Sequence, residues 1–310
     1  MNRFNYFMKY TEYLGRKLLT GMVQDHQFHS KRLKRLTGRT PDLVNPVTLS
    51  EKICYRMMHD HNPLYTRLAD KLAVRDYVAT RTQKVQLPTL LCVYDNVQSI
   101  DFSQLPDKFV LKCNHDSGSA VICTDKDKLN IARALQKLDF ALRKNMYYTT
   151  REWQYKNIKP VILCEKYIDL FFERDKSHTP EMLRIHCFHG IAGFIEADFT
   201  DDAGHGFINV YNRCWQLQPF QMEYPNTPWA IPEPELLHKA ITAAQELSTG
   251  IDYCRIDLML QRDVIYFSEI TLSPRRGKLQ ISPPEWDTRL GEMWNMAARQ
   301  TNPQLQTQKA

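Results

Sequence analysis

The sequence lacks any uninterrupted apolar run approaching the roughly 18 residues that a membrane-spanning helix needs. It also lacks, after Met1, the short basic segment and apolar core that mark a secretory signal. Glycine and proline are scarce, at 11 and 16 of 310 residues, and 43% of the residues are hydrophobic, which excludes a collagen-like, low-complexity or disordered chain. These absences predict a globular cytoplasmic protein.

No CxxC pair occurs among the eight cysteines. Several of them lie in apolar, strand-like runs such as VILC and RIHCF. This pattern is typical of reduced, mostly buried thiols of a cytosolic protein.

The net charge of +6 is concentrated in the first 40 residues. That segment holds nine Lys or Arg against Glu12 and Asp25, a net charge of +7, and leaves −1 for the rest of the chain. Apolar residues recur through it near helical spacing, at Phe4, Phe7, Met8, Leu14, Leu18, Leu19 and Met22. The segment is therefore expected to be helical and basic.

Three partners fit the basic segment 1–40. It can pack on the body of the protein as a solvated helix, or it can rest on a membrane surface that carries anionic lipid. Nucleic acid would be attracted to the same charge, but no helix-turn-helix, zinc-finger or RNP-like motif accompanies it, so no nucleic-acid partner is expected. Packing on the body and peripheral membrane contact both stay open.

Hydrophobic periodicity changes along the chain from helical to strand-like. Residues 48–81 have apolar positions three and four apart with a break at Asn62-Pro63, which predicts helices. After Pro88, β-branched and aromatic runs predict strands at TLLCVYDN, KFVLKCNH, AVICTD, PVILCEKYI, LRIHCFHG, AGFIEADF, YCRIDLML and VIYFSEITL. Further helices are predicted at 126–144, 234–249 and 284–300, and a hairpin turn is predicted at 261–263. A length of 310 residues fits two lobes, and the expected class is α+β.

Lys112 and the turn Ser117-Gly118-Ser119 are the first candidates for chemistry. A strand delivers the lysine, and backbone N–H groups around a glycine can approach phosphate oxygens without a Cβ in the way. The spacing is not that of a P-loop, and taken alone these residues are also typical of an ordinary hairpin.

Asp257 and Glu269 are the second candidates, on adjacent predicted strands joined by a tight turn. Antiparallel pairing would bring the two carboxylates together, and Arg255 shares a strand face with Asp257 as Thr271 does with Glu269. Carboxylates among apolar residues need a nearby cation, and a divalent metal on nucleotide phosphate would supply one. The other interpretation is an ion pair between Arg255 and Asp257 on a solvated face.

From Leu49 to about Trp294 the chain resembles the TupA-like group of ATP-grasp proteins, associated with teichuronopeptide and other polysaccharide biosynthesis. The matching stretches are NPLYTRLADKLAVRDYV, LPDKFVLKCNHDSGSAVI, REWQYKNIKPVILCEKYI and EITLSPRRG with EWDTRLGEMW. The resemblance implies an ATP-grasp fold, in which two α+β lobes sandwich ATP. It places a mostly helical N-terminal region at 1–69, the first lobe at 70–168, and the second lobe with a C-terminal helix at 169–310.

The resemblance also implies roles for individual residues, with ATP and Mg²⁺ as cofactors. Nucleotide contacts are implied for Lys71, Lys112, Ser117, Gly118, Ser119, Glu165, Lys166, Ile168 and Arg184, with the hinge around Glu165 and Ile168 receiving adenine. Metal ligands are implied at Asp257, Glu269 and Thr271, and catalytic contacts at Arg255, Arg275 and Arg276. Thr271 stands where many ATP-grasp enzymes have Asn, and the two arginines at 275 and 276 stand where the group tends to have small residues.

The implied activity is a carboxylate–amine ligase of surface-polysaccharide assembly that acts through an acylphosphate on small-molecule or saccharide substrates. A phosphotransferase acting on a sugar or uronate, and a non-catalytic ATP-binding assembly factor, are the alternatives. A glycosyltransferase is not indicated, because no DxD-like motif stands at a strand end and Asp201-Asp202 falls in a polar loop. His186 and His189 lack metal-ligand spacing and are expected to be structural.

Overall fold

The computed structural model describes residues 3–296 and divides the chain into two compact units. Unit 1 comprises Met1–Thr40, Cys54–Thr80 and Gln86–Phe172, and unit 2 comprises Pro41–Ile53, Arg81–Val85 and Glu173–Ala310. Two short N-terminal segments thus belong with the C-terminal half of the chain. The sequence predicts regions that follow one another along the chain. It does not predict that these two segments join unit 2, because they do so through contacts with residues far away in the sequence.

Residues 3–81 are mostly helical, as their periodicity predicts. Its helices are α1 Arg3–Thr20, α2 Asp25–Thr37, α3 Leu49–His59, α4 Pro63–Ala69 and α5 Val74–Arg81. The predicted break at Asn62-Pro63 is a helix start, where the Asn62 side chain accepts a hydrogen bond from the Leu64 N–H and proline occupies the first turn.

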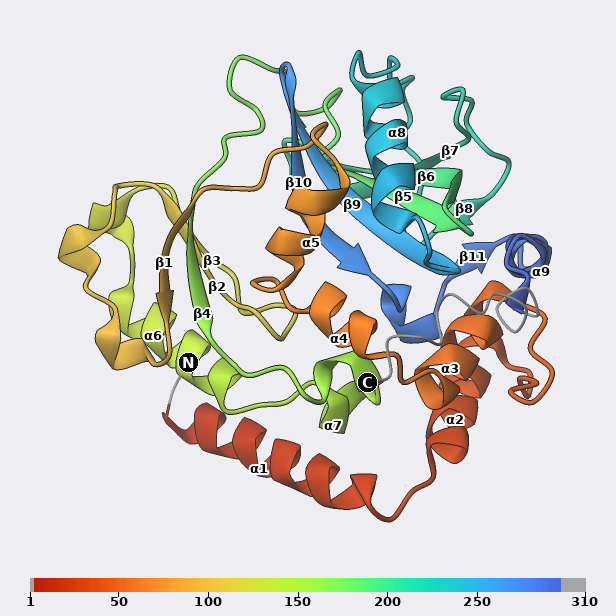
Figure 1. Cartoon of the computed structure of the whole chain (residues 1–310), viewed down its shortest axis with the longest axis horizontal. Helices are drawn as coiled ribbons and strands as arrows, with labels where there is room; N and C mark the ends of the chain where they lie inside the picture. Colours follow the sequence, from red (N-terminus) through yellow and green to blue (C-terminus); the bar gives the residue numbers. More distant parts are fainter. Residues whose placement is uncertain (1–2, 297–310) are drawn as a thin grey trace. The chain divides into compact units, whose positions relative to one another are not determined.

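Unit 1 contains a four-stranded antiparallel sheet with the order β1-β4-β2-β3 (Figure 1). Its strands are β1 Leu90–Tyr94, β2 Phe109–Cys113, β3 Val121–Cys123 and β4 Ile162–Lys166. Phe109 and Leu111 alternate along β2 into a core shared with Leu138 of α6 Ile131–Leu142. Because side chains alternate along a strand, Lys112 projects from the opposite face.

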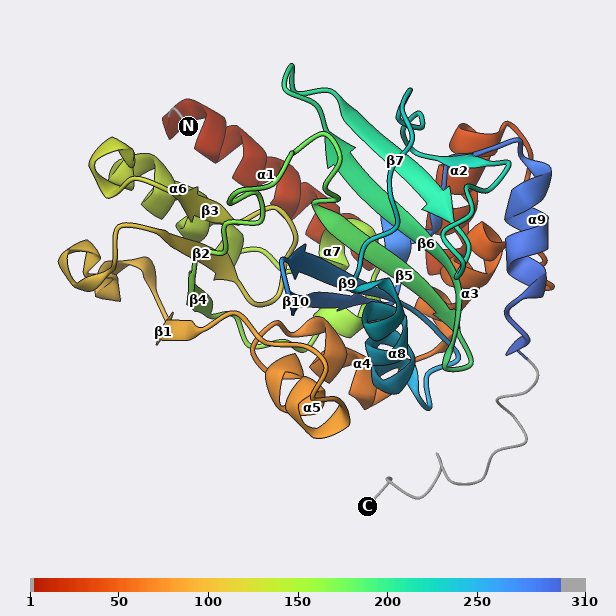
Figure 2. The same cartoon turned by 90° about the horizontal axis from the view of Figure 1, so that it is seen from above.

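Unit 2 contains a five-stranded antiparallel sheet with the order β10-β9-β5-β6-β7 (Figure 2). The strands are β5 Met182–Phe188, β6 Ile191–Thr200, β7 Gly206–Tyr211, β9 Tyr253–Gln261 and β10 Val264–Thr271. Helix α8 Leu237–Ser248 packs against β5, β6 and β9. The sheet face that carries Leu183, Ile185 and Ile256 is apolar and buried, so the charged residues of these strands alternate onto the other face.

The smaller elements complete the two units. They are α7 Tyr147–Thr150, β8 Gln221–Met222 paired with β11 Ile281–Ser282, α9 Glu285–Glu292, and short 3₁₀ turns at Val97–Ser99, Phe102–Gln104, Lys126–Lys128, Trp153–Tyr155 and Pro274–Gly277. Gly291 in α9 passes so close to the chain before α3 that an added Cβ would lie 2.2 Å from the Val47 carbonyl oxygen.

All eight predicted strands are present, and the hairpin turn at 261–263 is confirmed by the pairing of Gln261 with Val264. The predicted C-terminal helix is shorter than expected, because it ends at Glu292; the positions from 297 to 300 lie outside the described residues. Strand β7 was not predicted, because its β-branched and aromatic residues form only a short run between polar residues. The cysteines are free and six of the eight are buried, as expected.

Within residues 3–296, no helix combines the length and the apolar character that crossing a membrane would require.

Candidate functional site

Lys71 lies at the polar turn of unit 1 that was predicted to contact phosphate. Its Nζ donates a hydrogen bond to the Asp116 carbonyl oxygen at 2.7 Å. Ser119 donates to Asp116 Oδ1 at 2.5 Å and accepts from the Cys113 N–H, while Gly118 is exposed with φ +96°. The turn is thus anchored at its base and open at its tip, where a positive φ favours glycine.

Lys112 lies beside Glu165 on the face of the unit 1 sheet that points away from α6. The Lys112 Nζ is 2.6 Å from Glu165 Oε2, and Arg75 donates to Glu165 Oε1 at 3.1 Å. Glu165 is therefore a buried carboxylate held by two cations. At the end of β4, Lys166 is exposed and Ile168 is half-buried.

The register of β9 and β10 brings the predicted metal ligands of unit 2 together. Glu269 pairs directly with Asp257, and Thr271 pairs with Arg255. Arg255 forms a bidentate ion pair with Asp257, at 2.7 and 2.6 Å, and Thr271 Oγ1 donates to Glu269 Oε1 at 3.0 Å. Arg255 and Asp257 are only 6% and 3% exposed, so the ion pair lies on a buried face rather than a solvated one.

Two further carboxylates on β6 extend this charged face. Arg184 pairs with Asp257 in the β5–β9 register and with Glu196 in the β5–β6 register. Its guanidinium forms an ion pair with Asp198 and lies 3.9 Å from Glu196 Oε2 and 4.0 Å from Asp257 Oδ2. Among the described residues, Glu196 Oε2 and Asp198 Oδ1 are buried without a hydrogen-bond partner. Arg184 thus lies between Asp257 on one neighbouring strand and Glu196 and Asp198 on the other.

Burial changes the protonation of this face. It raises the pKa of Asp198 to about 7, despite the opposing charge of Arg184. Burial also raises the pKa of Asp257, against the effect of Arg255. For Glu196 burial acts in the same direction, but the hydrogen bond from His186 and the charges of the two arginines outweigh it and lower the pKa to about 2.

His186 has a structural role, as predicted from the sequence, because its ring contacts Glu196 of the charged face and the Tyr253 hydroxyl. Its Nε2 lies 2.6 Å from Glu196 Oε1 and its Nδ1 lies 3.0 Å from the Tyr253 hydroxyl. The ring is fully buried, and this desolvation lowers its pKa, which favours a neutral imidazole that donates to Glu196. His189 is exposed and accepts a hydrogen bond from the Asn295 N–H.

Arg275 and Arg276 follow β10 on the 3₁₀ turn Pro274–Gly277 and are both exposed. Both have positive φ, at 48° and 60°, a conformation that non-glycine residues rarely adopt. Arg275 Nε lies 3.8 Å from Glu223 Oε2. Strained backbone of this kind is often found where a functional side chain must be aimed.

The sequence matches the family of TupA-like ATP-grasp proteins over residues 51–295. The chain belongs to this family. The predicted recognition and fold class are thereby confirmed, and so are ATP and Mg²⁺ as the cofactors of the family. A search of curated proteins found no match.

Three solved structures that are similar to this TupA-like protein are two ligases and a synthetase. D-cycloserine synthetase DcsG is 14% identical with a TM-score of 0.40, covering 76% of this chain and 72% of that one. D-alanine–D-alanine ligase from Bacillus anthracis, complexed with ATP, is 18% identical with a TM-score of 0.37, covering 66% and 54%. ATP-grasp ligase PsnB, complexed with a phosphomimetic variant of its minimal precursor, Mg and ADP, is 11% identical with a TM-score of 0.38, covering 69% and 53%. The chain thus spans about half the length of two of these three structures, and the family match alone carries the assignment.

The donor atoms on β9 and β10 fit Mg²⁺ in the TupA-like protein. Carboxylate and hydroxyl oxygens are hard ligands, and four carboxylates on this face stand against two guanidiniums. Within residues 3–296 no three carboxylate, histidine or cysteine side chains converge on one point that could hold a metal. Mg²⁺ commonly takes one or two protein carboxylates and completes its shell with water and substrate phosphate.

Sequence reasoning missed Glu196 and Asp198, although a signal for them exists. In the run GFIEADFT they occupy alternate positions, two apart and following Phe194, so they share one face of an otherwise apolar strand. Charged residues at alternate positions of an otherwise apolar strand indicate that one face of its sheet is polar and forms part of a functional site. A register between β5 and β6 was needed to place them beside Arg184.

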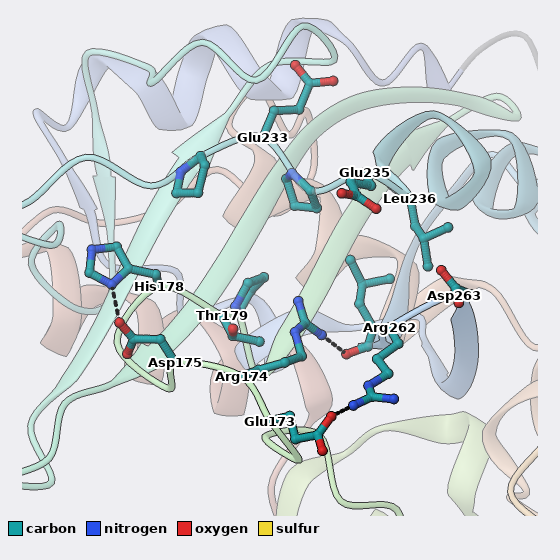
Figure 3. A pocket seen from close by; sticks show the side chains of 14 residues that line it. Glu173, Arg174, Asp175, His178, Thr179, Glu233, Glu235, Leu236, Arg262 and Asp263 are labelled. Carbon is teal, nitrogen blue, oxygen red and sulfur yellow. Dashed lines mark hydrogen bonds and ion pairs between the residues drawn. The ribbon is translucent and has the colours of Figure 1, made fainter.

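A separate cavity of about 530 Å³ in unit 2 lies outside this charged face (Figure 3). Several of the charged side chains that line it engage one another or the backbone. Arg262 pairs with Glu173, His178 Nδ1 lies 2.8 Å from Asp175 Oδ2, and Arg174 donates to the Leu260 carbonyl oxygen at 2.7 Å. The residues predicted to bind nucleotide or metal are not among those that line it.

Proposed function

We propose that this protein is an ATP- and Mg²⁺-dependent carboxylate–amine ligase that acts through an acylphosphate. A carboxylate oxygen of the substrate attacks the γ-phosphorus of ATP, and ADP leaves. The amine nitrogen of the second substrate then attacks the acyl carbon, and phosphate leaves as the amide forms. The family match supports this class of reaction.

The observation that carries the proposal is the pairing of Asp257 with Glu269 beside Arg255 on a buried sheet face. Asp257, Glu269 and Thr271 would hold Mg²⁺, which when bound neutralises phosphate charge. Arg255, kept in place by its bidentate contact with Asp257, would steady the transferred phosphoryl group.

In unit 1, Lys71 and Lys112 would supply positive charge to the phosphates. Each has a partner that phosphate oxygens can replace, the Asp116 carbonyl oxygen for Lys71 and Glu165 for Lys112. The N–H groups of the turn Ser117–Ser119 would close over the phosphates, because Gly118 is exposed and leaves room for close approach. The hinge residues Glu165, Lys166 and Ile168 would contact adenine and ribose.

The acceptor is proposed to be an anionic component of a surface polysaccharide, such as a uronic acid carboxylate. The support is the exposed pair Arg275 and Arg276 directly after the metal strand, which presents two guanidiniums to an anion. Arg184 would contact phosphate or substrate from β5. Membrane contact through residues 1–40 involves a different surface and is a separate proposal.

Product analysis tests the proposal directly. Purified protein is incubated with ATP, Mg²⁺, uronic acids and amino acids or amino sugars, and the products are separated by mass spectrometry. ADP with an amide product supports the ligase. ADP with a phosphorylated acceptor would assign a phosphotransferase instead, and nucleotide binding without turnover of any pair would assign a non-catalytic ATP-binding factor.

A further inference from the structure

Helix α1 is held to unit 1 by one face. The buried Tyr13 accepts a hydrogen bond from the Asn145 N–H at 3.1 Å, and Thr20 Oγ1 donates to the Tyr148 carbonyl oxygen at 3.4 Å. Lys17 Nζ lies 5.1 Å from the centroid of the Tyr148 ring. The three contacts come from positions three and four apart, so they lie on one side of the helix, next to α7 (Figure 1).

The opposite side of α1 presents large apolar side chains to solvent. A helix turns about 100° per residue, which places Met8 and Leu18 each about 140° around the axis from Tyr13, one on either side. Met8 is 52% exposed, Leu18 is 74% exposed, and Met22 just after the helix is 79% exposed. Leu14 and Leu19 are also exposed. We call these five residues the apolar stripe.

This orientation is the reverse of an ordinary amphipathic helix, whose apolar side faces the core. The apolar stripe is therefore not what attaches α1 to the protein. Contiguous exposed apolar side chains usually mark a docking surface, because leaving them in water costs free energy.

The charge of the segment that contains the apolar stripe indicates which partner covers it. Residues 1–40 carry a net charge of +7, and α2 exposes Lys31, Lys34 and Arg35 to solvent, with Arg39 exposed just beyond it. A second copy of the chain docking through the same stripe would bring two such basic segments together, which is unfavourable. An anionic lipid surface combines an apolar interior with negative headgroups and matches both features.

We propose that α1 is an in-plane membrane anchor. The apolar stripe inserts at the interface of a bilayer that contains anionic lipid, the opposite side of the helix stays attached to unit 1, and the basic residues of segment 1–40, those exposed on α2 included, are attracted to the headgroups. This role does not depend on the ligase activity, since the surface contains none of the residues proposed to bind ATP or Mg²⁺.

Co-sedimentation with vesicles tests the anchor in the full-length protein. The wild type should bind vesicles that contain one third phosphatidylglycerol at low salt, and bind pure phosphatidylcholine weakly. Leu18→Glu with Met22→Glu should lower the partition coefficient about tenfold or more, because two inserted side chains become charged. Lys34→Glu with Arg35→Glu should lower it by a similar factor and flatten its dependence on salt.

A matched control separates insertion from a general effect of surface charge. Leu217→Glu replaces a leucine of unit 2 that is 53% exposed, similar to Leu19 at 52%, and should leave binding unchanged. All variants should keep the melting temperature and the ATP affinity of the wild type, because the exchanged side chains are exposed.

Three results would overturn the anchor. The first is wild-type protein that ignores anionic vesicles at low salt. The second is a Leu18→Glu, Met22→Glu variant that binds as well as the wild type. The third is a wild-type dimer in sedimentation velocity that this variant converts to a monomer without any vesicle binding, which would assign the apolar stripe to self-association.

Discussion

The candidate residues of the two units differ in charge and in how firmly they are held. Unit 1 offers Lys71 and Lys112, long side chains whose partners can be exchanged, next to a turn with an open tip at Gly118. Unit 2 offers Asp257, buried beside Arg255, and the half-buried Glu269, which strand pairing places opposite each other. The side chains that would meet phosphate extend on long aliphatic stems, whereas those that would hold a metal are positioned by strand pairing.

The difference has a chemical reason. Phosphate oxygens are large, diffuse anions that flexible ammonium groups can follow, whereas Mg²⁺ demands oxygen ligands in nearly ideal positions. Antiparallel pairing places Cβ atoms of directly opposite residues about 4.5–5.5 Å apart, which is a convenient way to fix two carboxylates.

Glu269→Gln should produce the largest effect, on the unit 2 side of this comparison. The change keeps the shape of the side chain but removes the charge, so we expect ADP production to fall at least about a hundredfold while the melting temperature stays near that of the wild type. Turnover is measured with purified protein, ATP and Mg²⁺. Glu292→Gln, at an exposed glutamate at the end of α9, is the matched control and should be neutral. Near-normal turnover of Glu269→Gln would remove the proposed metal role.

Gly291→Ala and Gly118→Ala compare the packing of the two units. In α9 the new Cβ of residue 291 would lie 2.2 Å from the Val47 carbonyl oxygen and 2.9 Å from the Leu49 nitrogen, so we expect a loss of about 3 kcal/mol in the free energy of unfolding. Residue 118 has no atom within 4 Å of the new Cβ, and only its φ of +96° is unfavourable, which costs about 1 kcal/mol. Urea titration of both variants gives the values, and equal losses would contradict the contrast.

Asp198→Asn tests the buried carboxylates through pH. The pKa of Asp198 is about 7 in the folded protein and near 3.8 when unfolded, so the folded state binds the proton more tightly and its stability decreases as the pH rises from about 4 through 7. Between pH 5 and 7 the wild type should lose up to about 2 kcal/mol of unfolding free energy relative to Asp198→Asn. The measurement is urea unfolding of both proteins across that range. Parallel curves would show that Asp198 is ionised like an exposed aspartate.

Lys71→Ala and Lys112→Ala should have the smallest effects, on the unit 1 side. Each removes one cation from several around the triphosphate, so nucleotide affinity should fall about tenfold or somewhat more, on the order of 1.4 kcal/mol. Arg75 still pairs with Glu165 in the Lys112 variant, which keeps that buried carboxylate compensated. Calorimetric titration with an ATP analogue and Mg²⁺ measures the change, with the largely exposed Lys128→Ala as control. Unchanged affinity in both variants would remove the ATP-grasp roles assigned to these lysines.

Much of the fold follows from local patterns in the sequence. Alternation predicts strands β1–β6, β9 and β10, and helical spacing with Asn62-Pro63 predicts a helix start that the structure contains. The tight turn at 261–263 sets the register as far as Phe267 opposite Leu258, and a one-residue shift between Phe267 and Glu269 then brings Glu269 opposite Asp257. The hairpin was therefore predictable from the two-residue loop, but the direct pairing of the two carboxylates was not, because the unshifted register would place Glu269 opposite Ile256.

Other features needed contacts that no local pattern encodes. Glu196 and Asp198 join the site only because β6 pairs with β5 and places Arg184 between them. Likewise, the periodicity of residues 1–40 predicts a helix with an apolar side but leaves open whether that side packs on the body.

By itself, the sequence determined which residues share a face within regular helices and unbroken stretches of strand, because side-chain direction there follows spacing, whereas the irregularity between Phe267 and Glu269 was not predicted. The tertiary structure decided which faces are buried, and with that the ion pair of Arg255 with Asp257 became internal, the pKa of Asp198 rose, and the apolar stripe of α1 stayed outside. The physical reason is that burial removes water from a group, and water is removed by elements that are distant in the chain.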